Sequence, residues 1–114
     1  MFLDNSYYKG ILTEYIAIIY LFFHGYTILK RRYKTKFGEV DIIASKNKVI
    51  IGVEIKARFN KEPTPEFVFQ KQRDRIKRTL NYFIIKNNPK YINYSVLTEI
   101  IVFKSYFSLK HYKN

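Results

Sequence analysis

Two acidic residues interrupt the two most strand-like segments of this chain, and this arrangement constrains its fold more than any other feature. Asp41 lies in segment 39–45 (EVDIIAS) and Glu54 in segment 49–56 (VIIGVEIK), each between β-branched aliphatic residues. The polar residues Lys46, Asn47 and Lys48 separate the two segments, so we expect a β-hairpin. A carboxylate inside a buried strand is costly unless a cation or hydrogen bonds compensate for it. The pattern therefore predicts a compensated, functionally interesting pair of acids.

The length of the turn decides which side chains meet. If an even number of residues centred on Asn47 and Lys48 forms the turn, Asp41 lies opposite Glu54, with Cβ atoms about 5 Å apart. Lys56, two residues beyond Glu54, shares that face. Two carboxylates this close need a positive charge between them, and a divalent cation with oxygen ligands is suitable. The other interpretation of Asp41 is a strand-edge acid paired with one of the many lysines.

The remaining segments predict an α/β fold. We expect a helix over about 6–23, a strand over 26–33, a helix from Pro65 to about 86 and a strand over 95–103, followed by a basic tail over about 104–114. The order α-β-β-β-α-β indicates a mixed sheet flanked by helices, and 114 residues predict a single domain over 1–114. The first helix is apolar over more than one stripe, so we expect it to be well buried.

Charge and composition narrow the partners. A formal net charge of +12, from 21 Lys+Arg against 9 Asp+Glu, predicts a polyanionic ligand, nucleic acid above all. The absence of Cys excludes disulfides, thiolate zinc sites and a cysteine nucleophile, and it fits a cytoplasmic protein. The longest apolar run, 15–23, is far shorter than the about 20 residues that a spanning helix needs. His24 and His111 are interpreted as a helix-end residue and a tail residue without a chemical role.

Glu14, on the first helix, is the third acid of interest. Its helical neighbours on the same side, Gly10 and Ala17, are small and leave room for its carboxylate to approach a metal or a substrate. The other interpretation is a partly exposed Glu on a solvated helix flank, and spacing alone slightly favours it.

These residues resemble the PD-(D/E)xK nuclease superfamily, in which an Asp precedes a Glu-x-Lys on the next strand. More closely, the whole chain resembles the YraN family of predicted endonucleases, which are related in fold to archaeal Holliday-junction resolvases. The matching stretches are Gly10-x-x-x-Glu14, Gly25-Tyr26-x-Ile28-Leu29, 38–44 (GEVDIIA), Val53-Glu54-Ile55-Lys56-x-Arg58 and Lys71-x-x-x-Arg75-Ile76. One departure is the start of the last strand, where the family usually has Arg-x-Asp and this chain has Leu97-Thr98-Glu99.

The resemblance implies a restriction-endonuclease-like core and metal-dependent hydrolysis of phosphodiester bonds. The substrate would be nucleic acid, with DNA favoured over RNA and branched or structured DNA included. Asp41, Glu54 and the backbone carbonyl of Ile55 would hold Mg²⁺, with Mn²⁺ as an alternative, and Glu14 would complete the site directly or through a water. Lys56 would orient or activate the attacking water, and Lys71 would contact the phosphate or the water.

Binding would come from basic side chains that read backbone charge rather than sequence. We expect this role for Lys30, Arg31, Arg32, Lys34, Lys36, Arg58, Arg75 and Arg78. For the helix stripe Lys71, Arg75 and Arg78, an ordinary solvated helix face is an equally good interpretation.

Two rival functions remain open. A non-catalytic nucleic-acid-binding module that keeps the nuclease fold predicts salt-sensitive binding without cleavage, and the lost base at Leu97 supports it. A protein of anionic membrane surfaces needs a basic amphipathic helix with an exposed apolar face, whereas the first helix carries few bases, so no membrane partner is expected. A homodimer would suit a branched substrate, but no residue pattern indicates an interface.

Overall fold

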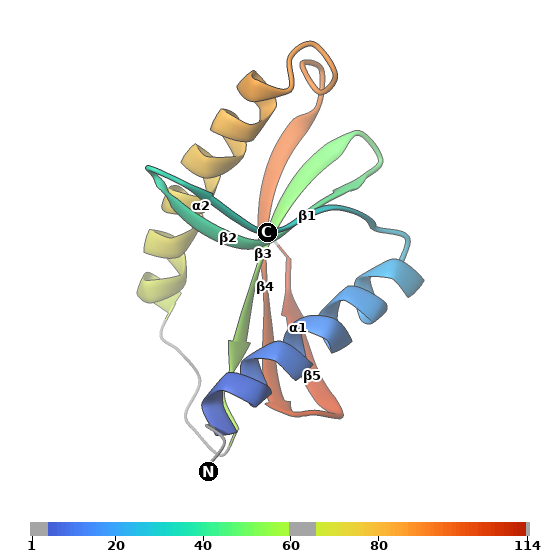
Figure 1. Ribbon diagram of the computed structural model, residues 1–114, viewed down its shortest axis with the longest axis vertical. Coiled ribbons are helices and arrows are strands. Elements are labelled where there is room, and N and C mark those ends of the chain that lie inside the picture. Colours follow the sequence, from blue (N-terminus) through green and yellow to red (C-terminus); the bar gives the residue numbers. More distant parts are fainter. Residues whose placement is uncertain (1–4, 60–65, 114) are drawn as a thin grey trace.

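The computed structural model describes residues 5–59 and 66–113, which form two helices and five strands (Figure 1). In chain order these are α1 (Asn5–Phe23), β1 (Thr27–Thr35), β2 (Gly38–Lys46), β3 (Val49–Ala57), α2 (Glu66–Lys86), β4 (Ser95–Ser105) and β5 (Ser108–Tyr112). The expected α-β-β-β-α-β order is confirmed, and the mixed α/β fold is compatible with a restriction-endonuclease-like core. Pro65, the expected start of the second helix, lies outside the described residues.

The sheet has the order β1-β2-β3-β4-β5, in which β3 and β4 are parallel and the other neighbours are antiparallel. Asn47 and Lys48 both have positive φ, 52° and 60°, which is the mark of a two-residue type I′ hairpin turn. Lys46 consequently pairs with Val49 and Ile42 with Val53. The even turn that the sequence argument took as its condition is therefore present.

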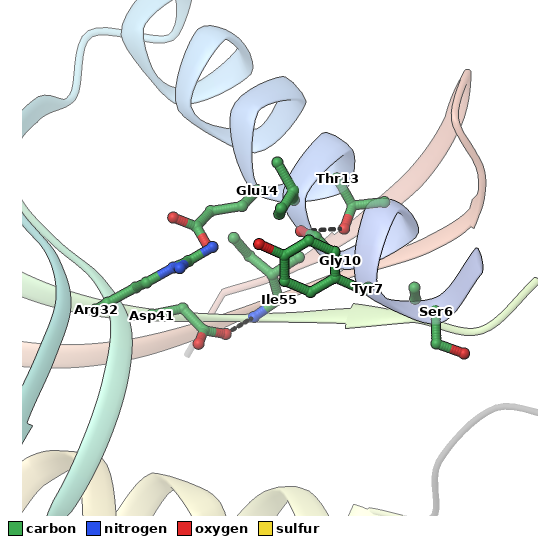
Figure 2. Close-up of a pocket in the computed structure, with 10 residues that line it drawn as sticks. Ser6, Tyr7, Gly10, Thr13, Glu14, Arg32, Asp41 and Ile55 are labelled. Carbon is green, nitrogen blue, oxygen red and sulfur yellow. Dashed lines mark hydrogen bonds and ion pairs between the residues drawn. The ribbon is translucent and has the colours of Figure 1, made fainter. Parts of the chain in front are cut away.

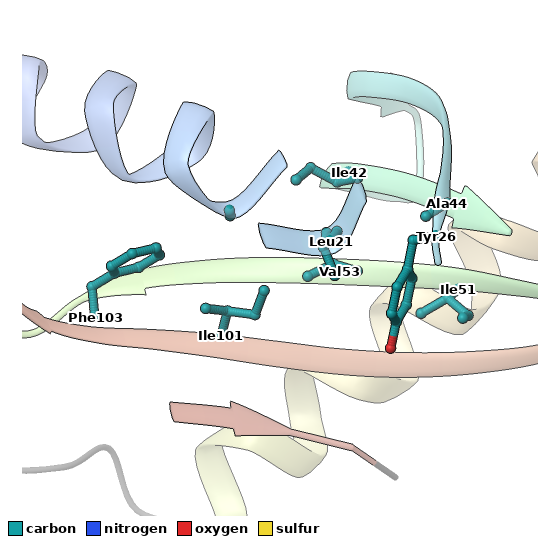
Figure 3. Close-up of a cluster of buried hydrophobic side chains, with 9 residues drawn as sticks. Leu21, Tyr26, Ile42, Ala44, Ile51, Val53, Ile101 and Phe103 are labelled. Atoms are coloured by element: carbon teal, nitrogen blue, oxygen red, sulfur yellow. The ribbon is translucent and has the colours of Figure 1, made fainter. Parts of the chain in front are cut away.

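Each face of the sheet carries one helix (Figure 1). Ala17 and Leu21 of α1 pack on one face, in a core cluster with Ile42, Val53 and Ile101 (Figure 3). The opposite face holds a second cluster, which α2 covers; it comprises Val40, Ile43, Ile50, Ile76, Leu80, Phe83 and Tyr91.

Gly52 of β3 permits the close approach of α2. A Cβ at this position would lie 2.5 Å from Cγ2 of Ile76 and 3.0 Å from Cδ1 of Leu80. Real Cβ atoms do not approach another atom as closely as 2.5 Å, so even alanine would force Ile76 to shift from its place against the sheet.

The expectation that α1 is well buried is wrong for its outer side. Leu12 is 45% exposed, Ile19 57% and Phe22 66%. A helix on the surface of a single sheet can bury only the stripe that faces the sheet, whatever the polarity of its other side. Within the described parts of the chain, neither helix is long and apolar enough to cross a membrane.

Segment 104–114, expected as a basic tail, is instead partly ordered into the sheet. Strand β4 continues to Ser105, and β5 pairs antiparallel with it, with Ile101 opposite His111. This fifth strand covers the edge that β4 would otherwise leave open.

Candidate functional site

A kink in the β1–β2 hairpin marks the position of the site. Regular pairs join Arg31 to Ile42 and Tyr33 to Val40, and between them Arg32 adopts a positive φ of 51°. Side chains two apart on a regular strand point to the same face. Here Val40 packs in the α2-side core and Ile42 in the α1-side core, so the alternation of faces breaks at Asp41.

Asp41 bridges from this kink to the next strand. The regular pairing of β2 with β3 ends at Ile42 and Val53. Beyond this pair, the backbone N–H of Ile55 donates a hydrogen bond to Oδ2 of Asp41 over 2.8 Å. The carboxylate thus takes the place of a backbone acceptor at the point where the two strands separate.

Asp41 and Glu54 form a largely buried carboxyl pair. The regular pairing from which the sequence predicted their meeting ends one step earlier, at Ile42 and Val53, and the kink at Asp41 intervenes. Burial raises the pKa of Glu54 to about 8, the charge of Asp41 contributes to this rise, and Lys56 opposes it. Burial also raises the pKa of Asp41, against the hydrogen bonds from Ile55 and with Glu54 and the charge of Lys56. Near neutral pH, the two side chains therefore hold a proton between them, with Lys56 close enough to act on both.

Glu14 approaches the kink from α1. It is only 7% exposed, so the expectation of a solvated helix flank is wrong. Oε1 accepts a hydrogen bond from Nη2 of Arg31 at 3.0 Å, and Oε2 accepts one from Nε of Arg32 at 3.1 Å. Consecutive strand residues normally face opposite ways. The left-handed conformation of Arg32 is what lets both arginines reach one carboxylate.

A pocket of about 390 Å³ lies between α1 and the strands at this point (Figure 2). In Figure 2, Glu14, Arg32 and Asp41 lie toward one end of the pocket, and Gly10, Tyr7 and Ser6 toward the other. Its full lining is Ser6, Tyr7, Gly10, Ile11, Thr13, Glu14, Arg32, Asp41, Ile55 and Ala57. The pocket thus joins an acidic and basic end to a mostly apolar one.

The other predicted residues are more scattered. Lys71, Arg75 and Arg78 are exposed along α2, and the aliphatic part of Arg75 lies over Gly38, where a Cβ would be 3.0 Å from Cδ of that arginine. Lys30, Lys34 and Lys36 are exposed on and beyond β1, whereas Lys56 and Arg58 are half-buried at the end of β3 and just after it. These side chains are spread over β1, the turn after it, the end of β3 and α2, and among them Lys56 acts electrostatically on both Asp41 and Glu54.

Among the residues that the structure describes, no group of three or more His, Cys, Asp or Glu side chains is arranged to hold a metal ion. Asp41 and Glu54 interact as a pair, and Glu14 lines the same pocket as Asp41. Mg²⁺ is commonly bound by one or two carboxylates, with substrate phosphates and waters supplying the other ligands. The donor set is therefore of the right chemistry for such an ion.

Sequence reasoning missed a second buried polar group. Oε1 of Glu99 accepts hydrogen bonds from the hydroxyl of Tyr26 at 2.8 Å and from Nε2 of His111 at 2.6 Å, while Nδ1 of His111 contacts the Tyr20 hydroxyl at 3.0 Å. Burial alone would raise the pKa of Glu99, but these hydrogen bonds lower it. His111 therefore holds a buried strand acid, and only a prediction of β5 could have revealed this role.

Comparison with known proteins gives the chain a family. The model of the uncharacterised protein family UPF0102 matches residues 13–102, a span that includes Glu14, Asp41 and Glu54. A UPF0102 protein of Clostridioides difficile strain 630 is 44% identical over 86 residues, which cover 74% of this chain and 75% of that protein. One of Ehrlichia ruminantium strain Gardel is 34% identical over 105 residues, covering 92% and 80%. A third, of Campylobacter jejuni subsp. doylei, is 38% identical over 83 residues, covering 73% and 74%. The chain therefore belongs to the UPF0102 family.

Proposed function

We propose that this protein is a metal-dependent nuclease of the PD-(D/E)xK type, acting on nucleic acid and on DNA in preference to RNA. The observation that carries the proposal is the buried Asp41–Glu54 carboxyl pair beside Lys56, held where β2 and β3 separate. A protein that only bound phosphates would gain nothing from two buried acids, because they repel a polyanion.

The pair suits a divalent cation for an electrostatic reason. Two carboxylates that share a proton can exchange it for a cation, which removes both the repulsion and the cost of burying the charges. Asp41, Glu54 and the carbonyl of Ile55 would hold Mg²⁺ or Mn²⁺, and Glu14 would assist from α1. When bound, the ion would polarise the scissile phosphate and lower the pKa of a coordinated water.

Lys56 and Arg32 supply the positive charge of the site. Lys56 already acts electrostatically on both Asp41 and Glu54, and we assign it the orientation of the attacking water and the stabilisation of developing negative charge. Arg32 lines the pocket beside Asp41 and is held by Glu14. Its guanidinium has further N–H donors with which to bind a phosphate oxygen.

The exposed basic residues would hold the rest of the substrate. Lys71, Arg75 and Arg78 lie on α2, and Lys30, Lys34 and Lys36 on the β1–β2 hairpin. Such side chains add affinity by neutralising phosphates and releasing counterions, so binding should weaken steeply with salt.

The second candidate is a nucleic-acid-binding module that keeps this fold without catalysis. The observation that favours it is the absence, among the described side chains, of a ready group of three metal ligands. It predicts that neutralising Asp41 leaves binding unchanged or improves it, and that no metal supports cleavage.

Cleavage of labelled substrates separates the two. Duplex, single-stranded, flap and four-way-junction DNA and an RNA would be incubated with Mg²⁺, Mn²⁺ or EDTA. We expect metal-dependent cleavage that Asp41→Asn and Glu54→Gln abolish and that Lys56→Ala slows by about 100-fold or more. The control is Asp74→Asn, because Asp74 is exposed on α2. Salt-sensitive binding without cleavage under either metal would refute the nuclease and support the binding module.

A further inference from the structure

Gly10 is a glycine that the packing of the described chain does not explain. It lies well inside α1, where glycine weakens a helix relative to alanine. Apart from its chain neighbours and the backbone of its own helix, a Cβ at this position would meet no described atom within 4 Å, in contrast to Gly52. Because Gly10 lines the pocket beside Asp41, its missing side chain keeps open a space that residues 5–59 and 66–113 leave unfilled.

The chemistry of this space changes along its length. Ile11, Ile55 and Ala57 contribute apolar side chains to the lining. Tyr7, which lies toward the end of the pocket away from Asp41 (Figure 2), is 61% exposed. The hydroxyl of Thr13 is turned to the backbone carbonyl of Lys9 at 2.8 Å. The lining therefore offers an aromatic face and aliphatic side chains, which suit a flat, mostly apolar ring.

The end of the pocket at Arg32 and Asp41 suits an anionic group that lies beside the proposed metal ion. Arg32 binds Glu14 through Nε and is still 53% exposed along its side chain. Its left-handed backbone is one of the sparsely populated conformations that concentrate at ligand sites. A ligand with a ring beside Tyr7 would thus place an attached charged group near Arg32 and Asp41.

We propose that this pocket accepts one unpaired nucleobase, stacked on Tyr7 in the space left by Gly10, with the adjoining phosphate toward Arg32 and Asp41. The pocket volume, about 390 Å³, lies in the lower part of the range of about 300–1,000 Å³ for small-ligand sites. A base enters such a pocket only when it is out of the helical stack, which costs least for a strand that is already single. The inference rests on the proposed function for the role of the phosphate, and it names single-stranded or flapped DNA as the substrate class.

The test measures base binding without catalysis. A single-stranded DNA oligonucleotide carrying one 2-aminopurine would be titrated with the protein in EDTA, alongside the same strand in a duplex, and followed by fluorescence quenching and anisotropy. We expect quenching with the single strand only. Tyr7→Ala should abolish it and weaken single-strand affinity by about fivefold or more, whereas Tyr7→Phe, which keeps the ring, should bind within about twofold of the parent protein.

Gly10→Leu fills the space while keeping the Tyr7 side chain, and it should have the same effect as Tyr7→Ala. Phe107→Ala is the matched control, because it removes a fully exposed aromatic ring (101%) from the β4–β5 turn. Circular dichroism and thermal melting would show that each variant folds, with Gly10→Ala as the smaller change. The proposal is overturned if Tyr7→Ala and Gly10→Leu leave single-strand binding unchanged, or weaken single-strand and duplex binding equally.

These outcomes are separate from those of the nuclease test. Quenching that depends on Tyr7, without cleavage in any metal, supports the base pocket and refutes the nuclease. Metal-dependent cleavage with no contribution from Tyr7 or Gly10 supports the nuclease and overturns the base pocket.

Discussion

Replacing Glu54 by Gln should stabilise the metal-free protein, and more so as the pH rises. The pKa of Glu54 is raised from 4.5 to about 8 in the fold, by burial first and by Asp41 second. Between those two values, the folded protein keeps a proton that the unfolded chain releases. The free energy of unfolding therefore falls as the pH rises through this window. Gln carries no such penalty, because it is neutral in both states and its amide can still donate to Asp41.

The magnitude follows from the two pKa values. One pKa unit corresponds to about 1.4 kcal/mol. The penalty that Glu54 brings to the folded protein then amounts to about 1 kcal/mol at pH 5, about 3 kcal/mol at pH 7 and about 4 kcal/mol at pH 8. The Glu54→Gln variant should exceed the parent protein in stability by up to these amounts.

Urea denaturation followed by far-ultraviolet circular dichroism, in EDTA at pH 5, 7 and 8, would measure the difference. Asp74→Asn is the control for loss of an exposed carboxylate and should change stability by less than about 0.5 kcal/mol at each pH. A parent protein as stable as Glu54→Gln at pH 8, or a gap that does not widen with pH, would refute the reasoning. Addition of Mg²⁺ should stabilise the parent and not the variant.

Three further changes test other parts of the structure. Gly52→Ala should lower the free energy of unfolding by about 1–3 kcal/mol, because its Cβ would clash with Ile76; an unchanged free energy in denaturant unfolding would contradict this. Glu99→Gln should cost about 1–3 kcal/mol at pH 7 through the lost hydrogen-bonded carboxylate. Because the pKa of Glu99 is lowered, the advantage of the parent should disappear on acidification through that pKa; an equal gap at acidic pH would contradict this. The double variant Lys71→Ala, Arg78→Ala should bind DNA more weakly, and the slope of log affinity against log salt concentration should become shallower by about two units. An unchanged slope in filter binding would exclude contact between these two side chains and the phosphates.

Local rules predicted most of the elements and the central register of this fold. The polar turn between two β-branched segments predicted a hairpin, and an even turn would place Asp41 and Glu54 at equal distances from its centre. The observed pairs Lys46–Val49 and Ile42–Val53 have that parity. Such predictions succeed because hairpin pairing depends on residues close in sequence.

Features that depend on distant partners were not predictable in the same way. The burial of Glu14 depends on two arginines from β1, and the role of His111 depends on β5 lying beside β4. The exposure of the outer side of α1 was not predictable either, because an all-round apolar helix is typical of a buried one. Nothing in the local sequence indicates that α1 packs against the sheet on one side only and is covered by no other described element on its outer side.

The kink at Arg32 and Asp41 connects the fold to the proposed chemistry. Val40 belongs to the core under α2 and Ile42 to the core under α1, and Asp41 between them packs in neither core. Packing on both sides holds the change of face in place, and this can offset the strain of a left-handed arginine. The side chain at the crossover is that of Asp41, which reaches β3 and meets Glu54 there. On this account the acids are costly to bury but hard to displace, because moving Asp41 would require one of two hydrophobic cores to repack.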